Sequence, residues 1–442
     1  MTEQIIIIVA ILSFITIGFI TKHGKIQSIG DFTISRNKLG WFPIAAGISM
    51  TFAGGAALLN MASLGYTFRW YNLVDPIAVT SGLIIVVLFI KRYRKDTGVT
   101  ISDMLSDSNK SLSVLIGLIT SIVFLLFLAA QFVALSKLLV PYFPSINPKL
   151  LTIIPSTLIF SYVFFGGFTS VTRTDIMQFF FILFLFLVPI SYFFIFKENS
   201  AINISPEISG QKMPINLMIL LAFPLLYIPF SQDINIRVKS AVSKKKAILG
   251  VLLGAFIYSS IIIASTYIGI TLAKDGIVLD DPESALSIFF KTYFPSIGII
   301  AIIATLAAII SSLDSYSLNA ISSISNDLLL KFRTNKKQRT IINISALFVF
   351  TFSLIIALFF NQVLSLILTA LLIYISVLIP IVLGKSIKIN DQLIFISSII
   401  IIGVICIIEL FNVELSPKAV IYPVIGISLM LLFFVISKIK RP

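Results

Sequence analysis

The chain is dominated by a succession of apolar segments, each long enough to cross a lipid bilayer as a helix. A spanning helix needs about 20 predominantly apolar residues, and the apolar runs number thirteen. Only 12% of the residues are charged, against about 25% in soluble domains. We therefore expect an all-α polytopic membrane protein. The runs lie near residues 4–20, 42–67, 72–90, 112–140, 150–168, 174–197, 213–231, 247–273, 294–329, 340–360, 362–384, 391–411 and 418–437.

Basic residues gather in alternate loops between these segments. The positive-inside rule makes such loops cytoplasmic, and an odd number of spans then puts the N-terminus outside and the C-terminus in the cytoplasm. The net charge of +14 is spread over these short loops rather than collected in one patch, so no nucleic-acid partner is expected. The basic loops lie at residues 22–38, 91–95, 173, 237–246, 331–339, 385–388 and 438–441.

The residue types that most enzymes need are scarce. The chain has one histidine, His23, and one cysteine, Cys406, and it lacks metal-ligand spacing and a phosphate-binding glycine loop. Neither an enzyme nor a bound cofactor is expected. The first apolar run follows Met-Thr-Glu-Gln without a basic region, so it reads as a first transmembrane helix rather than a signal peptide.

Two segments carry more helix breakers than an ordinary span. The segment 41–68 contains four glycines and the segment 213–231 contains three prolines. Glycine and proline are common in membrane helices generally, but interrupted helices at matching places indicate an inverted repeat and a transporter's binding site. We expect one transmembrane transporter domain, residues 1–442, divided into 1–40, a five-helix repeat at 41–197, its inverted partner at 213–384, and two peripheral helices at 391–442.

A polar stripe runs along the apolar segment 299–329. Its members recur every three or four residues, so they share one face of a helix. Single serines in membrane helices often bond to their own backbone or allow close packing. The whole stripe with an aspartate favours an ion or solute path. The stripe comprises Ala308, Ser311, Ser312, Asp314, Ser315, Asn319 and Ser322.

The run from Gly166 to Gln178, GGFTSVTRTDIMQ, resembles the signature of the sodium:solute symporter family. Three further stretches resemble that family in the same order: 31–41, 232–237 and 311–327. The resemblance implies secondary active transport by a fold of five plus five core helices, shared with the bacterial leucine transporter. One helix would precede this core and two would follow it. It also implies a multi-pass protein of the bacterial inner membrane.

The resemblance also implies a sodium site where the broken helix meets the stripe. Its ligands would be the backbone carbonyls of Met50, Ala53 and Ala308 with the hydroxyls of Ser311 and Ser312. Small hard cations prefer oxygen ligands, and uncharged ones allow the ion to leave again. Sodium is thus the expected coupling ion.

A second sodium site is implied by the same resemblance. Asp175 and Ser315, with Ser312 shared and Asp314 beside them, would form it. The residues leave another interpretation open, in which Asp175 is simply a first-turn acid of a helix beginning near Thr174.

Solute-binding residues are suggested by position. Asn60, Gln131 and Tyr227 lie on the broken helices or the fourth span, although Gln131 is equally suited to bonding a neighbouring helix. Gln232, Asp233 and Arg237 are expected to form a gating or structural network. The acidic residue and tryptophan of the family's proline carriers are replaced here by glycine, alanine or leucine.

The expected function is sodium-coupled symport of a small polar solute by a protein that works as a monomer in the lipid bilayer. Two alternatives remain open from the sequence. One is a proton-coupled carrier that uses Asp175 or Asp314, and the other is a membrane sensor that binds solute without transporting it.

Overall fold

A computed structural model describes residues 2–20, 28–34, 38–95, 98–106, 109–196, 211–295, 298–331, 338–410 and 418–439. The secondary structure within these ranges is helical apart from one isolated parallel bridge between Leu39 and Ala241. The all-α expectation is confirmed. The bridge joins the segment before the first broken helix to the end of α11, so these two distant stretches lie side by side.

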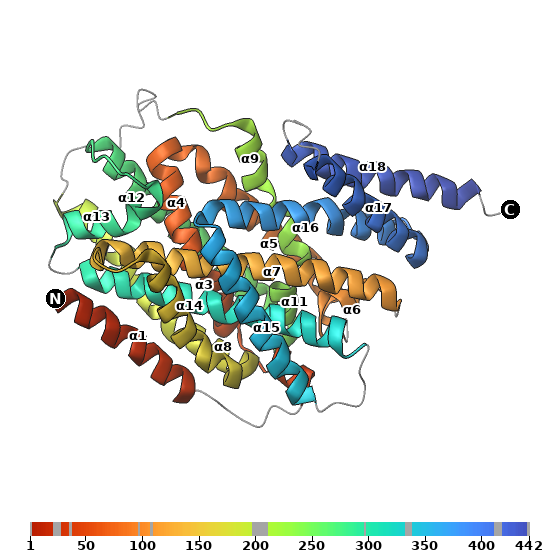
Figure 1. The fold of residues 1–442 in the computed structure, drawn as a ribbon, viewed down its shortest axis with the longest axis horizontal. Coiled ribbons are helices and arrows are strands. Elements are labelled where there is room, and N and C mark those ends of the chain that lie inside the picture. Colours follow the sequence, from red (N-terminus) through yellow and green to blue (C-terminus); the bar gives the residue numbers. More distant parts are fainter. Residues whose placement is uncertain are drawn as a thin grey trace.

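The helices follow one another along the chain, with short 3-10 turns between some of them (Figure 1). Their bounds are α1 (Thr2–Ile20), α2 (Ile29–Thr33), α3 (Trp41–Phe52), α4 (Gly55–Phe68), α5 (Val74–Lys95), α6 (Ile101–Leu105), α7 (Lys110–Leu139), α8 (Pro148–Phe196), α9 (Ile215–Ala222), α10 (Pro224–Tyr227), α11 (Gln232–Ser240), α12 (Lys244–Lys274), α13 (Ala285–Tyr293), α14 (Gly298–Ser323), α15 (Gln338–Phe359), α16 (Val363–Ser386), α17 (Asp391–Leu410) and α18 (Lys418–Ile439).

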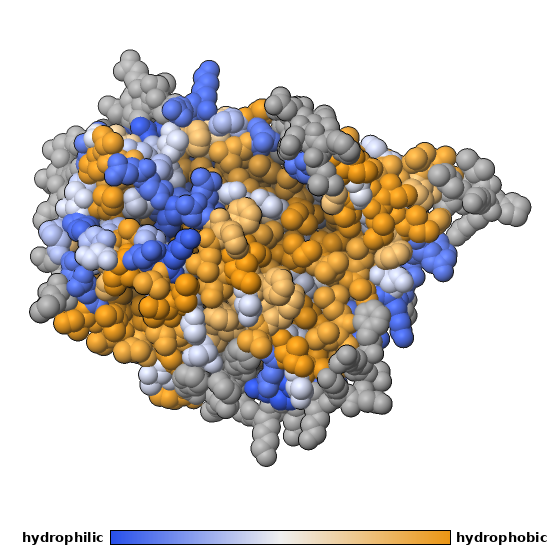
Figure 2. All heavy atoms as spheres, viewed as in Figure 1, coloured by the Kyte–Doolittle hydropathy of each residue, from blue (hydrophilic) through white to orange (hydrophobic). Residues whose placement is uncertain are grey.

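The described residues contain eight helical segments long and apolar enough to cross a membrane, and four shorter apolar helices. Their outward faces carry large apolar side chains, such as Leu88, Phe256 and Phe359, which are 74%, 69% and 82% exposed. Figure 2 shows a broad apolar surface across the middle of the molecule. Such a surface needs lipid around it, so the protein is a multi-pass membrane protein.

Both expected helix breaks are present. The first lies between α3 and α4, where Ala53 and Gly54 leave the helical path. A Cβ on Gly54 would stand 1.8 Å from the Ser312 hydroxyl oxygen, so only glycine lets α14 approach this break. The second spans α9 to α11. The helix is interrupted at Pro224 between α9 and α10, passes through a 3-10 turn at Ile228–Phe230, and leaves the helical path at Ser231.

One expected break is absent. Helical backbone runs from Pro148 to Phe196 without interruption, although two spans at 150–168 and 174–197 are expected from the sequence. The hydroxyls of Thr172 and Thr174 donate to the carbonyls of Phe168 and Val171 within the same helix. These hydroxyls are therefore used inside a continuing helix and do not cap the start of a new one. Asp175 therefore lies in mid-helix, and its interpretation as a first-turn acid is wrong.

Two long helices hold the core together. α12 packs along α3, α4 and α5, while α14 lies between α7 and α8 with nearly all its side chains buried. In Figure 1, α17 and α18 sit at the C-terminal end, and α1 lies at the opposite side of the molecule. The core therefore places the break between α3 and α4 against both α12 and α14.

The contact between α4 and α12 is made by backbone. A Cβ on Gly269 would stand 1.9 Å from the Ala62 carbonyl oxygen and 2.6 Å from the Tyr66 nitrogen. A Cβ on Gly250 or Gly254 of the same helix would first meet the side chain of Ile44 or Ile48 in α3, at 2.7 and 2.9 Å, with a backbone carbonyl close behind. Small residues allow such close crossing in membrane helices.

We expect Gly269→Ala to destabilise the protein, because the added methyl group overlaps backbone atoms that cannot rotate away. Overpacking of this kind costs about 1–3 kcal/mol. The matched control is Gly403→Ala in α17, where a Cβ meets nothing within 4 Å and alanine favours the helix by up to about 1 kcal/mol. Thermal unfolding in detergent should show a lower midpoint for Gly269→Ala only, and equal midpoints would contradict the close contact.

Candidate functional site

The break between α3 and α4 is closed by side chains of α14. The Ser312 hydroxyl oxygen lies 3.3 Å from each of the carbonyl oxygens of Met50 and Thr51. The Tyr316 hydroxyl donates to the Thr51 carbonyl at 3.1 Å. The last carbonyls of a helix lack partners within it, so the end of α3 presents its oxygens to α14.

The other residues expected at the first sodium site surround this contact. Ala53 caps the end of α3 and Ala308 lies one turn before Ser312, and both are fully buried. Ser311 instead donates its hydroxyl to Asp175 Oδ1 at 2.5 Å. The structure thus brings Met50 and Ser312 into contact, and it turns Ser311 toward α8.

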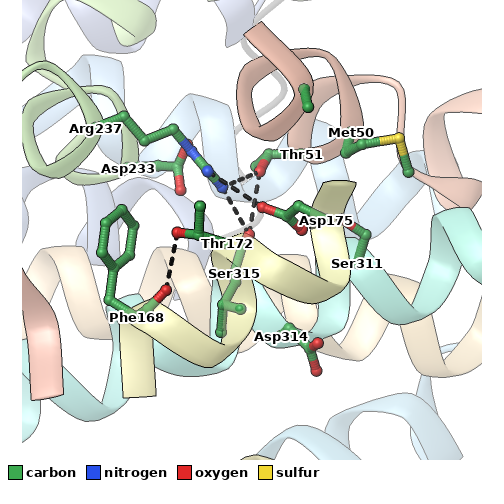
Figure 3. A network of polar contacts seen from close by, with 12 residues as sticks. Met50, Thr51, Phe168, Thr172, Asp175, Asp233, Arg237, Ser311, Asp314 and Ser315 are labelled. Atoms are coloured by element: carbon green, nitrogen blue, oxygen red, sulfur yellow. Dashed lines mark hydrogen bonds and ion pairs between the residues drawn. The ribbon is translucent and has the colours of Figure 1, made fainter. Parts of the chain in front are cut away.

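A fully buried arginine lies beside this break. The Arg237 side chain is 1% exposed and pairs with two carboxylates: Nε lies 3.0 Å from Asp233 Oδ2, and Nη1 lies 3.2 Å from Asp175 Oδ2. Its Nη2 donates to the hydroxyls of Thr51 and Ser315 at 2.8 and 2.9 Å. Figure 3 shows the guanidinium reaching between these side chains.

The neighbours of Arg237 leave space for its guanidinium and stabilise its charge. A Cβ on Gly47 would stand 1.8 Å from Nη1, so glycine on α3 makes space for the guanidinium. The Phe168 ring lies 5.9 Å from the guanidinium carbon, within range of a cation–π interaction. A buried charge requires such pairing and hydrogen bonding, and Arg237 has both.

The residues of the second expected sodium site do not all meet. Asp175 and Ser315 are joined through Arg237. Asp314 accepts a hydrogen bond from Thr174 at 3.3 Å, and Figure 3 shows it apart from the guanidinium. The polar stripe of α14 therefore serves more than one partner surface.

The rest of the stripe extends the same network. Asn319 donates to Asp233 Oδ1 at 3.3 Å, and Gln232 donates to the Asn319 carbonyl at 3.1 Å. The Ser322 hydroxyl lies 2.7 Å from that of Thr33 in α2. The network expected of Gln232, Asp233 and Arg237 is present, and Asp175 belongs to it.

A cavity of about 90 Å³ lies between the two broken helices. All three side chains expected to meet the solute line it: Asn60, Gln131 and Tyr227. Gln131 also accepts a hydrogen bond from the Ala56 backbone N–H at 3.2 Å, so it caps the first turn of α4. Both interpretations of Gln131 are therefore compatible with its position.

Aromatic rings form one wall of this cavity. Phe127 lies 5.7 Å from the Tyr227 ring and 5.3 Å from the Tyr316 ring, measured between centroids. Thr51 and Gly54 line the same cavity. The cavity therefore reaches the α3–α4 break, where the Ser312 hydroxyl contacts the end of α3.

Asp75 lies in this cavity without having been expected from the sequence. It stands in the first turn of α5, and its Oδ2 accepts a 2.6 Å hydrogen bond from the Tyr258 hydroxyl of α12. The available signal was an isolated carboxylate at the start of the apolar run 72–90. Periodicity does not show that this end of the span turns inward.

Comparison with known proteins identifies the family. The model of the sodium:solute symporter family matches residues 32–387 of the chain. The chain belongs to this family. A sodium/proline symporter of Staphylococcus aureus (strain USA300) is 23% identical over 359 residues, which cover 76% of this chain and 70% of that protein.

Solved structures of symporters share the fold of this family member. A Na⁺-coupled sialic acid symporter in a substrate-bound outward-open state superimposes with a TM-score of 0.73 at 16% identity, over 100% of this chain and 98% of the other. A nucleobase-cation-symport-1 family transporter in a closed conformation gives 0.55 at 14% identity, over 92% and 94%. Family and fold are those of transporters.

Removal of the buried positive charge of Arg237 should strongly destabilise this symporter-family protein. Arg237→Met leaves Asp175 and Asp233 without their counter-charge, and breaking a buried pair in this way costs about 3–5 kcal/mol. The control is Arg92→Met on the exposed side of α5, which should change stability by less than about 0.5 kcal/mol. Denaturant unfolding in mixed micelles measures both. Similar losses for the two variants would contradict the importance of the buried pair.

Proposed function

We propose that this protein is a sodium-coupled symporter of a small polar organic solute in a bacterial cytoplasmic membrane. The observation that carries the proposal is the contact of Ser312 with the carbonyls of Met50 and Thr51, directly beside the cavity between the broken helices. Family membership and the sodium/proline symporters among the relatives support the choice of sodium as coupling ion.

The sodium ion is proposed to bind at the α3–α4 break. Its ligands are the carbonyls of Met50, Ala53 and Ala308 and the hydroxyls of Ser311 and Ser312. A set of five neutral oxygens suits a small hard cation that must be released in each cycle. Ser311 can bind the ion while its hydroxyl donates a hydrogen bond to Asp175, because the hydroxyl oxygen keeps free lone pairs.

Coupling follows from the position of this site. Thr51 and Gly54 belong to the break and also line the cavity, so an ion and a solute bound side by side hold the same segment of backbone. Each ligand then favours the arrangement that the other needs, and the coupling between them is reciprocal. Alternating access moves both ligands together.

The second sodium site at Asp175, Asp314 and Ser315 stays a prediction. The Arg237 guanidinium already donates to Asp175 and to Ser315, so it supplies positive charge where that ion would bind. A second sodium ion would have to share Asp175 with Arg237. The contacts therefore favour the first site as the one that couples transport.

The proposed topology has thirteen spans, with the N-terminus outside and the C-terminus in the cytoplasm. It counts the continuous helix α8 as two spans, 150–168 and 174–197, because 49 residues exceed the roughly 20 that cross a bilayer. Residues 41–197 and 213–384 form the two inverted repeats, each with its broken helix, and the functional unit is a monomer. Residues 1–40 precede the repeats and residues 391–442 follow them. The breaks at α3–α4 and α9–α10 support this division.

Ser312→Ala should raise the sodium concentration needed for uptake of solute into proteoliposomes, because it removes one ion ligand. Loss of one polar contact between the ion and a ligand corresponds to a decrease in sodium affinity of about 3-fold to 10-fold. The matched control is Ser317→Ala, which removes a buried hydroxyl of the same helix that has no hydrogen-bond partner among the residues that the structure describes. Its sodium dependence should equal that of the wild type.

Two results would contradict sodium symport. Uptake driven equally well by a proton gradient without sodium would indicate a proton-coupled carrier that uses Asp175 or Asp314. Solute binding without exchange of labelled solute across the liposome membrane would indicate a sensor.

Single-cysteine labelling tests the topology at the two ends of one helix. In a Cys406→Ala background, Lys245→Cys and Lys274→Cys place exposed thiols at opposite ends of α12. We expect an impermeant reagent added to intact cells to label Lys274→Cys and to spare Lys245→Cys until the cells are opened. The reverse pattern would invert the proposed orientation.

A further inference from the structure

The cavity between the broken helices contains a single charged side chain among the described residues that line it. That residue is Asp75, and the lining includes neither lysine nor arginine. Its Oδ2 is held by the Tyr258 hydroxyl at 2.6 Å, which fixes the carboxylate at the cavity wall. An anionic wall without a protein cation attracts a positively charged ligand, because burial of an unpaired charge is unfavourable.

A second, independent feature of the cavity also calls for a hydrogen-bond donor. Asn60 is 2% exposed, and its Oδ1 has no hydrogen-bond partner within the described part of the chain. Two hydroxyl donors of the lining are already used, since Tyr258 donates to Asp75 and Tyr316 donates to the Thr51 carbonyl. The Asp75 carboxylate and the Asn60 Oδ1 are thus acceptors that a complementary solute can pair with its donors, beside the amide and hydroxyl donors of Gln131 and Tyr227.

The aromatic wall fits the same ligand chemistry. The Phe127 ring centroid lies 5.7 Å from that of Tyr227 and 5.3 Å from that of Tyr316. Aromatic faces attract an ammonium group more strongly than a neutral group of equal size. Asp75 also lies in the first turn of α5, where the helix dipole stabilises a carboxylate, but that explains neither the unpartnered Asn60 oxygen nor the rings.

We propose that Asp75 is a specificity-determining residue that binds the ammonium group of the transported solute, with Asn60 and the aromatic wall around it. The substrate class is therefore a small compound with a positively charged nitrogen, as a cation or a zwitterion. This assignment rests on the proposed function, because it takes the cavity as the site of a transported solute. Beyond the proposed function, it specifies that the solute carries a positive charge.

Paired probes test the charge directly on the wild-type protein. Each pair shares size and shape but only one member carries a positive nitrogen: L-proline with cyclopentanecarboxylate, choline with 3,3-dimethylbutan-1-ol, and ethanolamine with ethylene glycol. Thermal unfolding in detergent is recorded in sodium and in potassium salts. We expect at least one ammonium probe to raise the unfolding temperature in sodium, and its partner to leave it unchanged.

Variants place the effect on Asp75. Asp75→Asn should weaken the affinity for the active ammonium probe about tenfold or more, since a hydrogen bond to a charged group is lost. Asp75→Glu should retain part of the affinity because it keeps the charge. The matched control is Asp391→Asn at the start of α17, where the carboxylate pairs with Lys385 at 2.8 Å outside the cavity lining. Its probe affinity should equal that of the wild type.

The outcomes separate this inference from the sodium symport on which it rests. One outcome is that sodium stabilises the protein but both members of every probe pair act equally, or no ammonium probe acts at all. That outcome would overturn the role of Asp75 and leave sodium symport standing. An unchanged affinity in Asp75→Asn would do the same. Ammonium binding without any sodium effect would support the site and overturn the coupling. If Asp75→Asn does not fold, the paired probes and Asp75→Glu decide.

Discussion

The core of this transporter depends on one buried charge. The Arg237 guanidinium has five N–H donors in a rigid fork, and it uses them on acceptors from four helices: Thr51 of α3, Asp175 of α8, Asp233 of α11 and Ser315 of α14. Taking an arginine out of water is costly unless its partners are in place. The position of α11 and the end of α3 are therefore fixed together.

Thr51 connects this charge network to the site of the solute. Its hydroxyl accepts from Arg237, its carbonyl oxygen accepts from Tyr316 and lies 3.3 Å from the Ser312 hydroxyl, and the residue lines the cavity. A change at any of these contacts alters the end of α3. In alternating access, two arrangements of such a segment suffice to link distant groups, provided that each ligand favours one arrangement.

The parts of the fold that follow from periodicity and helix breakers were predictable. The apolar spans, the glycine-rich break at Gly54 and the proline-rich break at Pro224 are local properties of the chain. The uninterrupted helix through Asp175 was not predictable, because Thr172 and Thr174 look like capping residues in the sequence but donate their hydroxyls to carbonyls of the same helix.

The contacts between side chains of distant helices also could not be predicted from residue spacing. Stripe positions indicate which residues share a face of one helix, and positions on the broken helices and the fourth span indicated Asn60, Gln131 and Tyr227, which do line one cavity. They do not show which partner each residue meets. Asp175 meets Arg237, Asp314 meets Thr174, and Asp75 enters the cavity from a helix that looked purely lipid-spanning.

The glycine contacts of α12 have a mechanical consequence. Gly250, Gly254 and Gly269 bring α12 close to α3 and α4 on both sides of the break. Gly250 and Gly254 pack against the Ile44 and Ile48 side chains of α3, and Gly269 packs against the backbone of α4. Closely packed interfaces keep one arrangement or switch to another and do not deform continuously. α12 and the broken helix should therefore travel as one rigid body during transport, with the displacement taken up where α14 packs against them.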